Sequence, residues 1–196
     1  MARPKQFDQV SALRKAIRLF SQQGFAATST DELMCVMNVG RQSMYDTFGD
    51  KRALFLKALE MYVTESVHTL RAELEMPGSA LSAIQNALVT FAERSDLCSA
   101  DGCMGLSAIS EFGQRDPEVA RITRNAARVQ RDALMLTLTR AKNEGELNPD
   151  AELDSMADFF ESTLAGIRMA AKGGKSRRAL RNIAAFAGRA YTESNR

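Results

Sequence analysis

The spacing of apolar residues towards the C-terminus is the feature that most restricts what this chain can fold into. Between Met156 and Ala171, apolar side chains recur at i, i+3, i+4 and i+7, which places them on one face of an α-helix. The same period runs through most of the 196 residues, and the strict alternation typical of strands is nearly absent. Capping and stop signals divide these patterns, so the sequence predicts an all-α fold of about nine helices.

The N-terminal part of the chain carries the start and stop signals of short helices. Asp8 is an N-cap residue, and Gly24 lies where a left-handed residue would end the first helix. Residues 29–32, with the sequence STDE, form a capping box that opens a second helix. Asn38 tolerates the left-handed conformation of a tight turn, and a short third helix is expected over residues 41–48.

A short helix, a turn and a second short helix are what a helix-turn-helix requires. In such a motif the second helix buries one face, here supplied by Met44 and Phe48, and presents the other to a DNA groove. A guanidinium at the helix start suits guanine, an amide suits adenine, and a hydroxyl suits bases or phosphate. We expect DNA contacts from the side chains of Arg41, Gln42, Ser43, Tyr45 and Lys51 and from the backbone N–H groups of Ser29 and Thr30.

The chain resembles the TetR family of transcriptional repressors in two stretches, ALRKAIRLFSQQGFAATSTDEL and MNVGRQSMYDTFGDKRALF. The family signature of Tyr-x-x-Phe followed by a lysine three residues later is present as Tyr45, Phe48 and Lys51. The resemblance implies a nine-helix subunit in which three N-terminal helices bind DNA and the others bind an inducer and dimerise. It implies a DNA-binding domain over residues 1–52 and an effector-binding and dimerisation domain over residues 53–196.

Two positions depart from the family pattern. Asn38 stands where a turn glycine is usual, and Gly40 stands where a serine or threonine usually caps the recognition helix. Residues 1–52 contain eight Lys or Arg and five Asp or Glu, a local charge of +3 in a chain whose net charge is +2. This mild basic bias at the start of the chain agrees with DNA binding there.

The C-terminal two-thirds resembles the family less closely, as expected where the ligand varies. We expect an effector pocket among apolar residues of these helices, with the only histidine as a polar group. The candidate pocket residues are His68, Phe91, Met104, Ile109, Phe112, Met135, Leu138 and Phe160. The alternative for each is an ordinary core residue or, for the histidine, an ordinary surface or buried one.

The last two expected helices, about residues 155–172 and 177–192, mix large apolar residues with many alanines and glycines. Small residues allow helices to approach closely, so such a pair from each of two subunits would form a four-helix interface. DNA geometry also favours a dimer, because two recognition helices must meet major grooves roughly 34–36 Å apart over a near-palindrome. We therefore expect a homodimer through these helices.

Three cysteines, Cys35, Cys98 and Cys103, are too few for a disulfide framework and indicate reduced thiols in a cytosol. Cys98 and Cys103 lie five apart and one histidine cannot complete a tetrahedral set, so we expect no metal. A glycine-rich phosphate loop and a catalytic Cys/His or Ser/His/Asp arrangement are also missing, which argues against an enzyme. No apolar run approaches the roughly 18 residues of a membrane span.

The sequence thus predicts a cytoplasmic, dimeric transcriptional regulator that binds a palindromic operator and is released by an unknown small-molecule effector, with no cofactor. One alternative is a redox-responsive regulator that senses oxidants or electrophiles through Cys98 and Cys103. The other is a helical interaction module that does not bind DNA. Such a module would not show DNA affinity that falls steeply with salt, whereas a protein that contacts many phosphates must.

Overall fold

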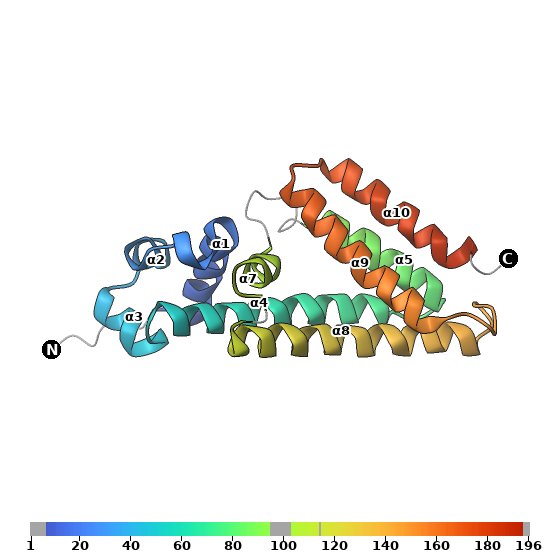
Figure 1. Cartoon of the computed structure of the whole chain (residues 1–196), viewed down its shortest axis with the longest axis horizontal. Helices are drawn as coiled ribbons and strands as arrows, with labels where there is room; N and C mark the ends of the chain where they lie inside the picture. The colour runs from blue at the N-terminus through green and yellow to red at the C-terminus, as the bar shows by residue number, and fades with distance from the viewer. Residues whose placement is uncertain (1–6, 95–102, 114, 194–196) are drawn as a thin grey trace. The chain divides into compact units, whose positions relative to one another are not determined.

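The computed structural model of the chain describes residues 7–94, 103–113 and 115–193. Within these ranges the chain forms nine helices and no strand, which confirms the predicted all-α fold (Figure 1). The helices are α1 (Gln9–Ala27), α2 (Thr30–Met37), α3 (Arg41–Phe48), α4 (Lys51–Leu74), α5 (Ala80–Glu93), α7 (Met104–Phe112), α8 (Pro117–Asn143), α9 (Leu153–Lys172) and α10 (Arg177–Glu193). None of the helices in this part of the chain is long and apolar enough to span a bilayer.

The helices form two compact units. The N-terminal unit comprises Met1–Val63 and Cys103–Thr123, and the C-terminal unit comprises Thr64–Gly102 and Arg124–Arg196. The N-terminal unit is therefore larger than the DNA-binding domain expected over residues 1–52, because α7 packs against α1. Helix periodicity shows which face of α7 is apolar but not which distant helix covers it. The functional division between residues 1–52 and 53–196 stays a prediction.

The N-terminal unit is built around a core contributed by each of its helices. Phe20 of α1, Leu33 of α2, Met44 of α3, Leu54 of α4 and Met104 of α7 are all fully buried. Because each helix contributes an apolar stripe to one centre, the short helices α2 and α3 are held by packing rather than by their own helix propensity. This packing gives the helix-turn-helix a rigid support.

One predicted helix end differs from the structure. Gly24 does break α1, with φ of 79° and ψ of 179°, but the helix resumes and continues to Ala27. It resumes because the side chain of Glu111 accepts hydrogen bonds from the backbone beyond the break. That partner lies more than eighty residues away and is invisible to local sequence signals.

In the C-terminal unit, α5, α9 and α10 pack against one another (Figure 1). Ala184, Ala187 and Gly188 of α10 are buried in this chain's own fold, and a Cβ on Gly188 would lie 3.1 Å from Cγ of Gln85. These small residues therefore serve the close approach of α10 to α5. By contrast, Gly166 of α9 has no neighbour near its Cβ position in the part of the chain that the structure describes.

Candidate nucleic-acid interface

Helix α2 begins with the predicted capping box. The Ser29 hydroxyl accepts a hydrogen bond from the Glu32 N–H at 3.1 Å, and the Glu32 carboxylate accepts one from the Ser29 N–H at 2.8 Å. The bond from the Ser29 N–H is the main reason that the pKa of Glu32 is lowered. The reciprocal bonds satisfy backbone donors that the first helical turn leaves without intrahelical partners.

Asn38 makes the turn between α2 and α3. Its φ of 57° and ψ of 50° place it in the left-handed region, as predicted, and it has the only positive φ among the non-glycine residues that the structure describes. The N–H groups of Asn38 and Val39 donate to carbonyl groups in the last turn of α2, each at 3.1 Å. Asparagine adopts this conformation more readily than most residues, so it replaces a turn glycine.

Helix α3 has one buried and one exposed side. Met44 and Phe48 are 0% and 4% exposed and form the buried side, as predicted. The side that faces solvent carries the polar residues Arg41, Gln42, Ser43 and Tyr45. The helix is only eight residues long, so its polar start and its exposed side form one small surface. Its side chains have the donors and acceptors that read base edges and phosphates.

The two ends of α3 are stabilised differently. At its start, Gly40 makes no side-chain capping bond. At its end, the ammonium of Lys57 donates to the carbonyl oxygens of Thr47 and Phe48, at 3.1 and 3.5 Å. A lysine at a helix C-terminus satisfies the last carbonyls and the negative end of the helix dipole. This role of Lys57 was not predicted, although a lysine shortly after the helix is a usable signal.

Two acidic residues hold the predicted base-reading side chains. The Arg41 guanidinium forms an ion pair with Asp31 at 2.9 Å, and the Gln42 amide donates to Asp46 at 2.7 Å. The side chains of Arg41 and Asp31 are 65% and 79% exposed, so this pair contributes little to stability. The i, i+4 spacing could have indicated the Gln42–Asp46 bond, but nothing local indicates the Arg41–Asp31 pair.

Two of the remaining residues predicted to contact DNA, Ser29 and Lys51, have partners within the protein. The Ser29 N–H is engaged by Glu32, which leaves Thr30 as the other predicted backbone donor at the start of α2. The Lys51 ammonium lies 4.3 Å from the centroid of the Phe25 ring. This cation–π contact positions a half-buried lysine near the start of α4. The contacts of these residues with phosphate stay predictions.

The eight predicted effector-pocket residues do not form one cluster. Met104 and Phe112 belong to the core of the N-terminal unit, whereas Phe91, Leu138 and Phe160, with Met135 packed against them, belong to the core of the C-terminal unit. His68 and Ile109 are exposed. Phe112 lies 5.4 Å from the rings of Phe25 and Phe55, measured between centroids, so it packs with the DNA-binding helices.

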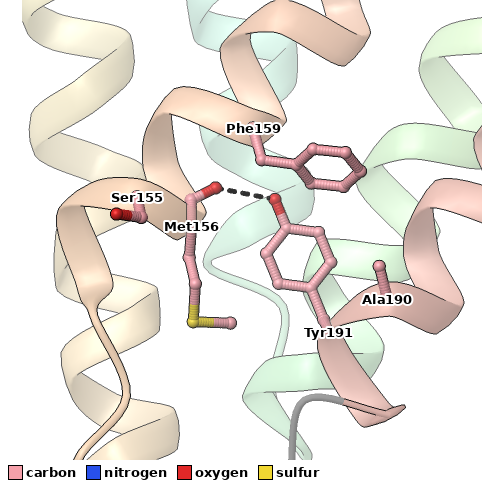
Figure 2. A pocket seen from close by; sticks show the side chains of 5 residues that line it. All are labelled: Ser155, Met156, Phe159, Ala190 and Tyr191. Atoms are coloured by element: carbon pink, nitrogen blue, oxygen red, sulfur yellow. Dashed lines mark hydrogen bonds between the residues drawn. The ribbon is translucent and has the colours of Figure 1, made fainter.

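The structure shows a hollow of about 270 Å³ elsewhere, between α9 and α10 (Figure 2). It is lined by Ser155, Met156, Phe159, Ala190 and Tyr191, none of which was a predicted pocket residue. The Tyr191 hydroxyl donates to the Met156 carbonyl at 2.8 Å, and burial raises the pKa of that hydroxyl. The hollow opens beside the exposed Phe159, on a surface of the two helices expected to dimerise.

Of the proposed redox pair, Cys98 lies outside the described residues. Cys103 is 5% exposed and precedes α7, where its sulfur accepts a hydrogen bond from the Tyr62 hydroxyl at 3.2 Å. A buried thiol that already has a hydrogen-bond donor is poorly placed to meet an oxidant. No cluster of three or more His, Cys, Asp or Glu residues that could hold a metal occurs within residues 7–94, 103–113 and 115–193.

Two family models match the chain, one over each part. The model described as "Bacterial regulatory proteins, tetR family" matches residues 12–58, which include α2, the turn and α3. The model described as "Tetracyclin repressor-like, C-terminal domain" matches residues 77–186. Both matches agree with the resemblance seen in the sequence.

Similar proteins are described as HTH-type or TetR family transcriptional regulators. The uncharacterised HTH-type transcriptional regulator YezE of Bacillus subtilis is 33% identical over 174 residues, which cover 88% of this chain and 90% of YezE. The HTH-type transcriptional repressor ComR of Escherichia coli is 26% identical over 195 residues, covering 97% and 92%. A solved structure of the TetR family regulator CifR, a cysteine mutant complexed with 26-base-pair operator DNA, has a TM-score of 0.79 and 26% identity, covering 96% of this chain and 100% of that one.

Proposed function

The chain belongs to the TetR family of DNA-binding transcriptional regulators, and from this premise we propose that it is a ligand-released repressor that reads a palindromic operator as a dimer. The observation that carries the proposal is the two-sided α3. Met44 and Phe48 fix the helix to the core while Arg41, Gln42 and Tyr45 stay exposed. A recognition helix needs this combination of a rigid support and an accessible polar side.

We assign specific roles to the residues around α3. Arg41 and Gln42 would read base edges in the major groove, since a guanidinium and an amide make bidentate contacts with guanine and adenine. Ser43, Tyr45, Lys51 and the start of α2 at Thr30 would contact phosphates and fix the register of the helix. Contacts to phosphates give affinity that depends on salt, and contacts to bases give specificity.

The repressor role is supported by what similar proteins are called. ComR is described as a repressor, and so is BdcR of E. coli, which is 24% identical over 192 residues. A repressor of this kind acts by occupying an operator, so it would work in the cytoplasm, where the chromosome lies. Release by a ligand requires that the ligand bind the DNA-free state more tightly than the DNA-bound state.

Dimerisation is supported by apolar side chains that α9 and α10 leave exposed. Phe159, Met169 and Phe186 are 43%, 58% and 71% exposed. Large apolar side chains gathered on two adjacent helices mark a surface that a partner covers. A second copy is the partner that two symmetric half-sites require, and an isologous contact would repeat the same surface on both subunits.

Effector control would act through α4, which contributes residues to both compact units. We propose that a small molecule bound in the C-terminal unit biases α4 and so changes the spacing of the two recognition helices. The candidate contacts are Phe91, Met135, Leu138 and Phe160, which share the core of that unit.

The test is selection of DNA fragments from the source genome by the full-length protein, followed by affinity measurements at several salt concentrations. We expect a near-palindromic site whose affinity falls steeply with salt. Arg41→Ala should weaken binding by about tenfold or more and relax specificity at one position in each half-site. Arg128→Ala, which removes an exposed arginine of α8, is the control and should have no effect. Retention of no fragment, or equal binding by both variants, would refute the assignment of α3.

A further inference from the structure

Glu111, near the end of α7, is bound to the backbone of α1. Its two carboxylate oxygens accept hydrogen bonds from the N–H groups of Phe25, at 2.8 Å, and Ala26, at 2.6 Å. Hydrogen bonds in which the acceptor carries a charge are shorter and stronger than neutral ones. The carboxylate therefore joins two helices that are far apart in the sequence.

The two N–H groups need this partner because of the break in α1. The backbone of Gly24 leaves the helical region, which interrupts the regular bonds of the helix at this point. A Cβ at position 24 would lie 3.0 Å from the nearer Glu111 oxygen, so a side chain here would push the carboxylate away. Gly24 thus provides both the positive φ and the space for the carboxylate.

Helix α7 is anchored at both ends within the N-terminal unit. At its start, Cys103 accepts the hydrogen bond from Tyr62 of α4. At its end, the ring of Phe112 packs against Phe25 and Phe55 beside the Glu111 contact. The helix therefore ties α1 to α4, and α1 in turn packs against α2 of the helix-turn-helix.

We propose that Glu111 is a positioning residue for DNA reading: its carboxylate fixes the direction of α1 at the break and thereby the placement of α2 and α3. This inference rests on the proposed DNA-binding role of α3.

The direction in which DNA affinity changes in a Glu111 variant distinguishes this positioning role from a simple charge effect. Glu111→Gln removes a negative charge from the DNA-binding unit, which by electrostatics alone would leave DNA affinity unchanged or raise it. A glutamine side chain has a single acceptor oxygen and cannot accept both N–H groups in the same way. If Glu111 positions α1, the variant binds its selected operator more weakly, by about tenfold, because fewer molecules hold the reading conformation.

The experiment compares wild type, Glu111→Gln, Glu111→Ala and Glu60→Gln on the operator fragment obtained by genomic selection, at several salt concentrations. Glu60 is an exposed acid of α4 in the same unit and is the matched control, whose affinity should stay equal or rise slightly. We expect both Glu111 variants to lose affinity with an unchanged salt slope, because no phosphate contact is lost. Affinity that stays equal or rises in both Glu111 variants would overturn the proposal.

Amide hydrogen exchange on the same proteins shows whether the variants remain folded and where they change. We expect the amides of Phe25 and Ala26 to exchange at least about tenfold faster in the Glu111 variants while the buried helices stay protected. Unchanged protection of these two amides would also overturn the proposal. A wild-type protein that retains no genomic fragment would refute the DNA-binding role of α3, whereas equal binding by wild type and variants refutes only the role of Glu111.

Discussion

Asn38 turns the chain between α2 and α3, and its side chain has to accept a left-handed backbone. We predict that Asn38→Ala lowers the free energy of unfolding by about 1 kcal/mol, because a Cβ without a local hydrogen-bonding group is costly in this region. Asn38→Gly should be neutral or slightly stabilising. Asn86→Ala, in the exposed face of α5, is a control of opposite sign, because alanine is the better helix former. Urea unfolding measures all three, and equal loss from Asn38→Gly and Asn38→Ala would contradict the prediction.

Asp116 combines two roles at the start of α8. Its carboxylate caps the helix through the Glu118 and Val119 N–H groups, and it accepts two bonds from the Arg52 guanidinium at 2.6 and 3.1 Å. The bonds from Arg52 are the main reason that the pKa of Asp116 falls from 3.8 to about 2. A carboxylate whose pKa is lower in the folded state stabilises the fold above its unfolded pKa and loses this effect as pH falls.

We therefore predict a pH-dependent difference between wild type and Asp116→Asn. Asparagine keeps the capping ability but cannot pair with Arg52, so the variant should be less stable at neutral pH. The difference should shrink as pH falls from about 4 to about 2, where the wild-type carboxylate is protonated. Thermal unfolding of both proteins across this pH range measures the difference in stability. A difference that stays constant with pH would show that the ion pair is not its source.

At the scale of elements, the helix-turn-helix was predictable because its signals are local. The capping box at Ser29, the turn at Asn38 and the buried pair Met44 and Phe48 each depend on residues within about one helical turn. The contacts that tie these elements to the rest of the unit are not local. Glu111 meets α1 across more than eighty residues, and Arg52 meets Asp116 across more than sixty. Periodicity identifies an apolar face but not its partner, so these contacts needed the structure.

The ion pair between Asp31 of α2 and Arg41 of α3 leads to a prediction about DNA affinity. Asp31 holds the Arg41 guanidinium, and if Arg41 reads a base, as proposed, DNA must displace Asp31. Asp31→Asn should raise operator affinity about two- to fivefold, because an exposed ion pair contributes at most about 1 kcal/mol and a negative charge near the phosphates is removed. Asp132→Asn removes a comparable exposed ion pair, with Arg128 of α8, and should leave DNA binding unchanged. Weaker binding by Asp31→Asn would show that the pair orients Arg41 for reading rather than restraining it.

At the scale of the whole molecule, the predicted effector pocket shows the limit of sequence reasoning. All the candidates except His68 are apolar residues of a helical pattern, and most of them are packed in a core. They divide between two compact units because the pattern of a single helix does not reveal which unit it joins. Phe112 illustrates this, since its ring packs with Phe25 of α1. The helix count and the buried face of α3 depend only on local spacing and were predicted.

The proposed dimer provides the last prediction, because two large apolar residues of nearly equal exposure lie on different helices. Phe186 of α10 is 71% exposed and Leu136 of α8 is 70% exposed. If α9 and α10 form the interface, Phe186→Ser should raise the dimer dissociation constant by about tenfold or more, since aromatic residues at an interface centre contribute strongly to binding. Leu136→Ser should leave it unchanged.

Sedimentation over a range of protein concentrations measures this dissociation constant, and operator binding provides a second readout. Because each subunit supplies one recognition helix, Phe186→Ser should bind a full palindrome more weakly while its affinity for a single half-site stays the same. The opposite result, in which Leu136→Ser dissociates the dimer and Phe186→Ser does not, would place the interface on α8. The exposed apolar residues of α9 and α10 would then need a different partner.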